Sequence, residues 1–185
     1  MMNDILTITE ESLLKELEQS NIDLNSINEL VVKALAENNM KIATAESCTG
    51  GLISKNITEV SGSSDVFDCG ICSYSNDIKS KVLGVDKNTL ETLGAVSAET
   101  AMHMAKGVRL LSDSDMAIST TGIAGPTGST DTKPVGLVYI GLSTPAKEIA
   151  VKALLAQNKT NNRARVRELA AVYAMYFAYK EISRV

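Results

Sequence analysis

A short polar stretch, "ATAESCTGGL" at residues 43–52, carries the side chains best suited to covalent chemistry in this sequence. Ser47 lies in its middle, and Thr49, Gly50 and Gly51 follow. Apolar residues before the turn predict a strand, and the residues after it predict a helix. A hydroxyl at such a turn is placed to attack a carbonyl carbon. The amides of Thr49 and Gly50 are then placed to stabilise the oxyanion that forms, and Gly51 is a further candidate for binding the oxyanion or the substrate.

Other interpretations of this stretch remain open. It is not a P-loop, because no Gly-Lys-Ser/Thr follows, and it is not the α/β-hydrolase elbow, because Ala45 and Thr49 replace the two glycines of that motif. A Ser or Thr that caps a helix, with glycines that allow close packing, explains the same residues. Taken alone, the stretch favours this structural interpretation.

The second polar cluster is "CSYSNDIKSK" at residues 72–81, where Tyr74 and Asn76 close a predicted strand and Lys79 lies in the first turn of the next helix. Asn76 is also a candidate for binding the substrate. A serine nucleophile needs a base, and the single histidine, His103, lies on a predicted helix far from any glycine-rich turn. Lys79 is the remaining candidate. Its pKa would have to fall to roughly 7–8 through burial or a neighbouring cation, and the Tyr74 hydroxyl could relay the proton or orient the amine. A solvated lysine at a helix start is the alternative.

The third cluster, "TTGIAGPTGSTDTKPVG" at residues 120–136, runs from a strand end into a long loop. Gly122, Gly125 and Gly128 allow close approach of the backbone to a ligand, and Lys133 could contact an anion. Thr121, at the predicted strand end, is a further candidate for binding the substrate, together with Gly122 and Gly125. The alternative is a mobile surface loop. All three clusters follow predicted strands, and in α/β sheets ligands bind beyond the carboxyl ends of strands.

Two arginines lie one turn apart at the start of the predicted C-terminal helix, Arg163 and Arg167, and Arg165 between them is expected to face away. They form either a solvated basic face or a phosphate clamp across a subunit boundary.

The order of elements predicts an α/β fold, a three-layer α/β/α sandwich with a mixed sheet. Apolar periodicity predicts helices at 9–20, 26–39, 50–60, 76–84, 86–94, 97–112 and 161–182, and strands at 41–46, 65–75, 114–121, 136–144 and 148–156. The strand at 65–75 is expected to be buried. A capping box of Ser26 with Glu29, an N-cap at Ser97 and a C-cap at Gly84 are expected to bound helices.

Composition limits the classes of function. The chain has 185 residues, enough for one domain with a sizeable core, and its net charge of −4 argues against a nucleic-acid binder with a basic face. A small anionic ligand stays possible, because its pocket needs only a few cations and backbone amides. The N-terminus does not resemble a signal peptide, and no apolar run approaches the length of a membrane span. Three cysteines in a chain without a secretion signal are expected in a cytoplasmic protein.

A C-x-x-C pair, Cys69 and Cys72, invites a zinc or redox interpretation. A zinc site needs about four ligands, and strand positions three apart point to opposite faces. We therefore expect two small buried residues, and neither a metal nor a cofactor.

In combination, the clusters resemble a known family. The segments "ATAESCTGGLIS", "SGSS", "YSNDIKSKVLGV", "AVSAETA", "TTGIAGPTG" and "KPVGLVYIG" are similar to the C-terminal domain of the competence/damage-inducible protein CinA, which also occurs alone as nicotinamide-nucleotide amidase. The resemblance covers roughly residues 26–180, and "AESCTGG" with "TGIAGP" at this separation is specific.

The resemblance implies hydrolysis of the carboxamide of nicotinamide mononucleotide to nicotinate mononucleotide and ammonia, without metal. It places the family's nucleophile, tyrosine and lysine on Ser47, Tyr74 and Lys79, and its helix-start arginines on Arg163 and Arg167. It also suggests a homo-oligomer, a dimer or higher, with a small nucleotide as substrate and no nucleic-acid or membrane partner.

The sequence departs from the family pattern in places. Residues 1–22 form a helical extension before the family-like domain, which is expected to span 23–185, and that extension would pack on the core or against a partner. The pyrophosphatase-like domain that precedes this domain in full-length CinA has no counterpart here, so its activity is not expected. The glycine and acid usual before Arg163 are missing. A non-catalytic nucleotide-binding or assembly module, or an amidase for another carboxamide, are the alternative functions.

Overall fold

The structure, a computed structural model, describes residues 5–156 and 162–184. The strands are β1 (Thr7–Thr9), β2 (Ile42–Glu46), β3 (Phe67–Cys72), β4 (Met116–Gly122), β5 (Leu137–Ser143) and β6 (Glu148–Leu154). The helices are α1 (Glu10–Gln19), α2 (Ile27–Glu37), α3 (Leu52–Thr58), α4 (Asn76–Leu83), α5 (Lys87–Thr92), α6 (Ala98–Ser112) and α7 (Arg163–Ile182), with a 3-10 turn at Ser63–Asp65. Three parts of the predictions lie outside the described residues: residues 1–4 of the extension, residue 161 of the last helix, and residue 185.

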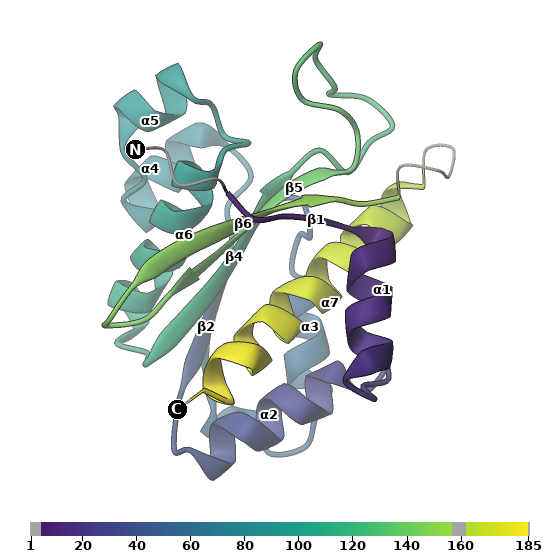
Figure 1. Cartoon of the computed structure of the whole chain (residues 1–185). Helices are drawn as coiled ribbons and strands as arrows, with labels where there is room; N and C mark the ends of the chain where they lie inside the picture. Colours follow the sequence, from purple (N-terminus) through teal and green to yellow (C-terminus); the bar gives the residue numbers. More distant parts are fainter. Residues whose placement is uncertain (1–4, 157–161, 185) are drawn as a thin grey trace.

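The strands form one mixed sheet in the order β1-β6-β5-β4-β2-β3. The pairs β2–β3, β2–β4 and β1–β6 are parallel, whereas β4–β5 and β5–β6 are antiparallel. Helices α4, α5 and α6 cover one face, and α1, α2, α3 and α7 cover the other (Figure 1). The predicted three-layer α/β/α sandwich with a mixed sheet is confirmed.

The central strands hold the core, and the prediction of a buried strand at 65–75 is wrong. Every residue of β2 is buried, since β2 pairs on both sides and is covered on both faces. Strand β3 pairs only with β2 and lies at the sheet edge, so its residues alternate between partly buried and exposed. Its Cys69 is partly buried and its Cys72 is exposed, so these are not the two buried residues expected, although they do lie on alternating sides of the strand.

Two of the three predicted helix caps are confirmed, and one is wrong. The Ser97 hydroxyl accepts the Thr100 amide at the start of α6, and Gly84 ends α4 in the left-handed conformation. The capping box at α2 is wrong: the Ser26 side chain makes no cap bond and instead donates to the Asp23 carbonyl at 3.0 Å.

The N-terminal extension contains an element that hydrophobic periodicity did not reveal. Strand β1 is only three residues long, and it joins the sheet edge in parallel with β6. In α1, which was predicted, Leu13 and Leu17 are buried in the main core, and Glu16 accepts from Lys180 of α7 at 2.7 Å. The extension thus packs on the core, while the domain boundary between residues 22 and 23 stays a prediction.

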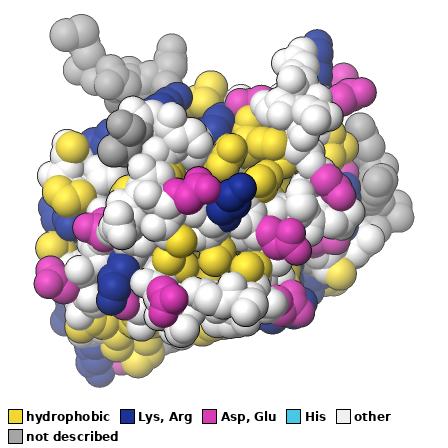
Figure 2. Space-filling view, turned by 90° about the horizontal axis from the view of Figure 1, so that it is seen from below, with side chains coloured by type: hydrophobic (Ala, Val, Ile, Leu, Met, Phe, Trp, Pro, Cys, Tyr) yellow, Lys and Arg dark blue, Asp and Glu magenta, His cyan; other side chains and the backbone are white. Residues whose placement is uncertain are grey.

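Charge on the surface is mixed. In the view of Figure 2, lysine and arginine side chains are interspersed with acidic ones, and hydrophobic side chains lie between them. None of the helices in the described segments combines the length and the apolar character that a bilayer crossing requires.

Candidate active site

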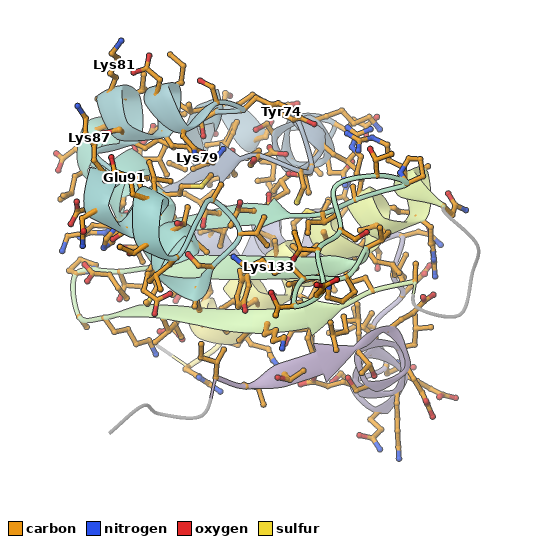
Figure 3. The ribbon with its side chains drawn as sticks, turned by 90° about the horizontal axis from the view of Figure 1, so that it is seen from above. Tyr74, Lys79, Lys81, Lys87, Glu91 and Lys133 are labelled. Atoms are coloured by element: carbon orange, nitrogen blue, oxygen red, sulfur yellow. The ribbon has the colours of Figure 1, made fainter. Side chains whose placement is uncertain are left out.

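The three polar clusters meet at one edge of the sheet. Strands β2, β3 and β4 are parallel neighbours. Glu46, the last residue of β2, is paired with Cys72 at the end of β3 on one side and with Thr120, two residues before the end of β4, on the other. The chain leaves these strands at the same level, which brings Ser47, the start of α4 and the loop after β4 together. Figure 3 looks onto this edge and shows Lys79 on α4, while Lys133 belongs to the loop after β4.

The predicted nucleophile and base are in direct contact. The Lys79 Nζ lies 3.0 Å from the Ser47 Oγ, 2.7 Å from the Ser73 carbonyl oxygen and 3.2 Å from the Tyr74 carbonyl oxygen. The Lys79 side chain is only 1% exposed, and this burial lowers its pKa below the ordinary value of 10.5, although the neighbouring Cys48 raises it slightly. A lysine with a lowered pKa is the kind of base that a serine without a histidine requires.

Two backbone carbonyls orient the amine. A neutral amine has two N–H donors and one lone pair. If the Ser73 and Tyr74 carbonyls accept the two N–H groups, the lone pair faces the Ser47 hydroxyl and can receive its proton. In the protonated state the third N–H donates to the Ser47 oxygen instead. The same geometry therefore serves both halves of a proton transfer.

The Tyr74 side chain lies at the entrance of the site and not between the nucleophile and the base. It is 71% exposed, and its hydroxyl accepts from Arg163 Nη2 at 3.2 Å. Its backbone carbonyl, rather than its hydroxyl, contacts Lys79. Because Ser47 and Lys79 are in direct contact, a proton relay through the Tyr74 hydroxyl is not needed.

The turn after Ser47 is held by the neighbouring strand β4. The Ser47 amide donates to the Thr120 carbonyl at 2.9 Å, and the hydroxyls of Thr49 and Thr120 are 2.7 Å apart. Gly50 has a φ of +60°, a conformation that glycine adopts without strain. Within the described segments, the amides of Thr49 and Gly50 have no acceptor. They remain the candidate oxyanion donors.

Glu46 is a site residue that sequence reasoning missed, and it corrects the role expected for Gly51. Its carboxylate is fully buried and accepts the amides of Gly51 (2.9 Å), Ile53 (3.1 Å) and Ser54 (2.8 Å), together with the Ser54 hydroxyl (2.7 Å). The first amides of α3 are therefore occupied by the protein, and Gly51 is not an oxyanion donor. An acid at the end of an apolar strand, before a helix whose N-cap is glycine, was the available signal, because glycine has no side chain to cap that helix.

Replacing Glu46 with glutamine is expected to lower stability by about 2–4 kcal/mol, because the glutamine NH₂ would face backbone amides that need an acceptor. Since Glu46 directly precedes Ser47, activity should fall together with the melting temperature. Thermal unfolding of Glu46→Gln beside the exposed Glu37→Gln tests this expectation. Equal melting temperatures for the two variants would contradict it.

A small cavity of about 190 Å³ opens beside Ser47. Ten residues from all three clusters, from the loop before α6 and from α7 line it: Ser47, Cys48, Tyr74, Lys79, Ala95, Val96, Thr121, Gly122, Ala124 and Arg163. Gly125 is outside this lining, but its carbonyl accepts from Arg163 Nη1 at 2.9 Å and so helps to hold that side chain. Thr121 donates to the Ala95 carbonyl, which ties the end of β4 to the loop before α6.

Two predicted ligand contacts lie away from this cavity. Asn76 lines a different hollow between α4 and α5. Lys133 Nζ donates to the Leu93 carbonyl at 2.7 Å, so it joins the loop after β4 to the end of α5 and does not line the cavity. Besides Lys79, the basic residue in the cavity lining is Arg163.

Cys48, the adjacent thiol, is buried, and burial raises its pKa to about 12. At neutral pH it is a protonated thiol, which is a poor nucleophile.

A larger groove, of about 840 Å³ between α4 and α6, lies away from Ser47 and Lys79. At its floor Gly107 of α6 has no room for a side chain, because a Cβ there would meet the Leu83 carbonyl of α4. This close contact fixes the position of α4, and therefore of Lys79.

Gly107→Ala should push α4 away from α6 and lower kcat by roughly 10- to 100-fold, because small displacements of a catalytic group are costly. Gly62→Ala serves as the control, since it strains a positive-φ glycine in open space far from the site. We expect it to lower stability but to keep kcat. A Gly107→Ala variant with unchanged kcat would show that α4 is not held by this contact.

Comparisons with known proteins identify the family of this chain. The family model described as "CinA C-terminal domain" matches residues 24–182. Competence-damage inducible proteins of Caldanaerobacter subterraneus and Acetivibrio thermocellus are 49% and 47% identical over 160 and 177 residues, which cover 86% and 92% of this chain. The matches cover only 38% and 41% of those relatives, so the chain spans about two fifths of their length.

A solved structure supports the same assignment. The crystal structure of the competence/damage inducible protein CihA from Agrobacterium tumefaciens superimposes with a TM-score of 0.81 at 34% identity, covering 86% of this chain and 95% of that one. The family match extends over most of the chain, including Ser47, Lys79 and both arginines at the start of α7. This chain belongs to the CinA C-terminal domain family.

Proposed function

We propose that this protein hydrolyses the carboxamide of nicotinamide mononucleotide to nicotinate mononucleotide and ammonia. The observation that carries the proposal is the 3.0 Å contact between Ser47 Oγ and the buried Lys79 Nζ at the wall of a cavity. A serine paired with a lysine of lowered pKa is suited to attack an amide carbon.

In the first half of the reaction, Ser47 Oγ attacks the carboxamide carbon while Lys79 takes the hydroxyl proton. The carbonyl oxygen becomes an oxyanion, which the amides of Thr49 and Gly50 stabilise. Lys79 then gives its proton to the nitrogen of the carboxamide, the carbon–nitrogen bond breaks, and ammonia leaves. The pyridine ring is left as an ester on Ser47.

In the second half, a water molecule takes the place of ammonia. Lys79 accepts a proton from the water as its oxygen attacks the ester carbon, and returns a proton to Ser47 Oγ as the ester bond breaks. The product is the carboxylate. Both the nucleophile and the base are side chains, so the cycle requires no metal ion.

The size and polarity of the cavity suggest how the substrate lies. Its 190 Å³ is below the roughly 300–1,000 Å³ of typical small-molecule sites. We therefore place the carboxamide and its ring inside, with the ribose and the phosphate at the entrance. Arg163 and Tyr74 lie there, and a guanidinium is well suited to bind a phosphate.

Ammonia release from nicotinamide mononucleotide by the purified protein, with and without a chelator, tests the proposal. We expect release at equal rates in both cases. No release from this substrate, but release from another carboxamide in a panel, would replace the substrate and keep the chemistry. Tight nucleotide binding without any product would favour the non-catalytic binding module.

A further inference from the structure

The carbonyl of Thr49, in the turn after Ser47, accepts from a guanidinium of α7, which covers the sheet face opposite to α4. Arg167 of α7 donates to this oxygen from Nη2 at 2.6 Å and from Nε at 3.2 Å. A carbonyl that accepts two bonds from one charged group is strongly fixed in direction. Arg167 is partly buried and does not line the cavity beside Ser47.

The Thr49 carbonyl and the Gly50 amide belong to the same peptide unit. A trans peptide is planar, so its C=O and N–H groups point in opposite directions. Because the carbonyl points toward α7, the Gly50 N–H points away from α7. Helices α7 and α4 cover opposite faces of the sheet, and α4 carries Lys79 (Figure 1). The free amide is therefore directed to the side on which Ser47 meets Lys79.

This peptide unit needs to be held. A residue with φ of +60° follows it, and a peptide before such a glycine can reverse its orientation at little steric cost. Reversal would direct a carbonyl oxygen, instead of an N–H, toward the oxyanion. The guanidinium opposes the reversal because it would lose both bonds, and it also polarises the peptide, which makes the Gly50 N–H a stronger donor.

We propose that Arg167 is a positioning residue that directs the Gly50 amide at the oxyanion formed by attack of Ser47. It acts through the Thr49–Gly50 peptide and does not contact the substrate. Arg163, one turn earlier, takes the different place at the cavity entrance. The inference rests on the proposed role of Ser47 as nucleophile, and it assigns the two arginines different tasks.

The test compares Arg167→Met with Arg165→Met. Arg165 is the matched control, since it is two residues away on the same helix and pairs with Glu10 and Glu168 instead of the turn. Loss of an oxyanion donor should lower kcat by about 10²-fold with KM within about threefold, because the oxyanion exists only in the transition state. Arg165→Met should keep kcat within about twofold. Arg167→Lys keeps the positive charge but not the paired N–H donors of the guanidinium, so it should recover part of the lost kcat.

Separate measurement of kcat and KM distinguishes this positioning role from a substrate-binding role. A raised KM with unchanged kcat in Arg167→Met would show that Arg167 binds the substrate, and would overturn the proposal. Equal losses of kcat in Arg167→Met and Arg165→Met, scaled to their melting temperatures, would show a purely structural role and would also overturn it.

A second measurement does not depend on the substrate. A fluorophosphonate phosphonylates an activated serine with loss of fluoride, and its P=O oxygen occupies the oxyanion position. The rate of Ser47 modification, followed by intact mass, should fall in Arg167→Met and persist in Arg165→Met. If that difference appears while nicotinamide mononucleotide is not hydrolysed, the proposed substrate fails and the inference stands. Hydrolysis with equal modification rates in both variants overturns the inference alone, and a wild type with neither activity overturns both.

Discussion

Alanine at position 47 is expected to abolish carboxamide hydrolysis, with a loss of about 10⁴-fold or more in kcat, because removal of a nucleophile takes away the covalent route altogether. The fold should persist, since the Ser47 amide, which bonds the Thr120 carbonyl, is unchanged and the lost side chain is small. Ammonia release and thermal unfolding of Ser47→Ala measure the two effects separately.

The neighbouring cysteine sharpens this test. A thiol is intrinsically the better nucleophile, but burial raises the pKa of Cys48 to about 12 and keeps it protonated. We expect Cys48→Ala to keep kcat within about tenfold. Full activity in Ser47→Ala together with an inactive Cys48→Ala would transfer the role of nucleophile to the thiol.

Methionine at position 79 is expected to be nearly as damaging to activity but harmless to stability. The substitution removes the amine while a chain of similar length still fills the buried space, so kcat should fall by about 10³-fold or more. At the same time the amine of a residue that is 1% exposed no longer has to be kept in the interior, and we expect this gain to offset the loss of its bonds to the Ser73 and Tyr74 carbonyls. Lys79→Met should therefore melt at the same temperature as the wild type or higher, a trade-off typical of catalytic groups.

The difference in stability between Lys79→Met and the wild type is expected to decrease as the pH rises. The pKa of Lys79 is lowered in the folded protein, so between that value and 10.5 the unfolded chain binds more protons than the native one. Stability of the wild type then rises with pH through this window, and the advantage of Lys79→Met shrinks. The activity of the wild type should also rise with pH up to the lowered pKa of Lys79, since only the neutral amine accepts a proton. A Lys79→Met variant that is less stable at neutral pH, or that retains activity, would contradict this account.

Local patterns were sufficient for much of the fold. Alternating strand and helix signals predicted the three layers, and Ser97 and Gly84 marked helix ends because capping involves residues close together in sequence. The wrong predictions concern features that depend on contacts with segments distant in the sequence. Strand β3 has an apolar sequence but lies at the sheet edge, and β1 is too short to show periodicity and exists through its pairing with β6.

The candidate site shows the same division. The residue types at 47, 74 and 79 and the family motifs indicated a serine and lysine pair from sequence alone. Yet the distance between them, the burial of Lys79 and the place of the Tyr74 hydroxyl depend on how two parallel strands end side by side. The subunit count stays a prediction.

Arg163 and Arg167 illustrate a distinction that could not be predicted from the sequence. They are the same residue type one helical turn apart, and the sequence treats them alike. In the structure one lies at the cavity entrance and the other behind the Thr49–Gly50 peptide. Glu46 is similar, because an acid at a strand end becomes a buried helix cap only when α3 folds back onto it. Sequence determines residue chemistry and local periodicity, whereas contacts between distant segments depend on sheet order and helix packing, which no short stretch encodes.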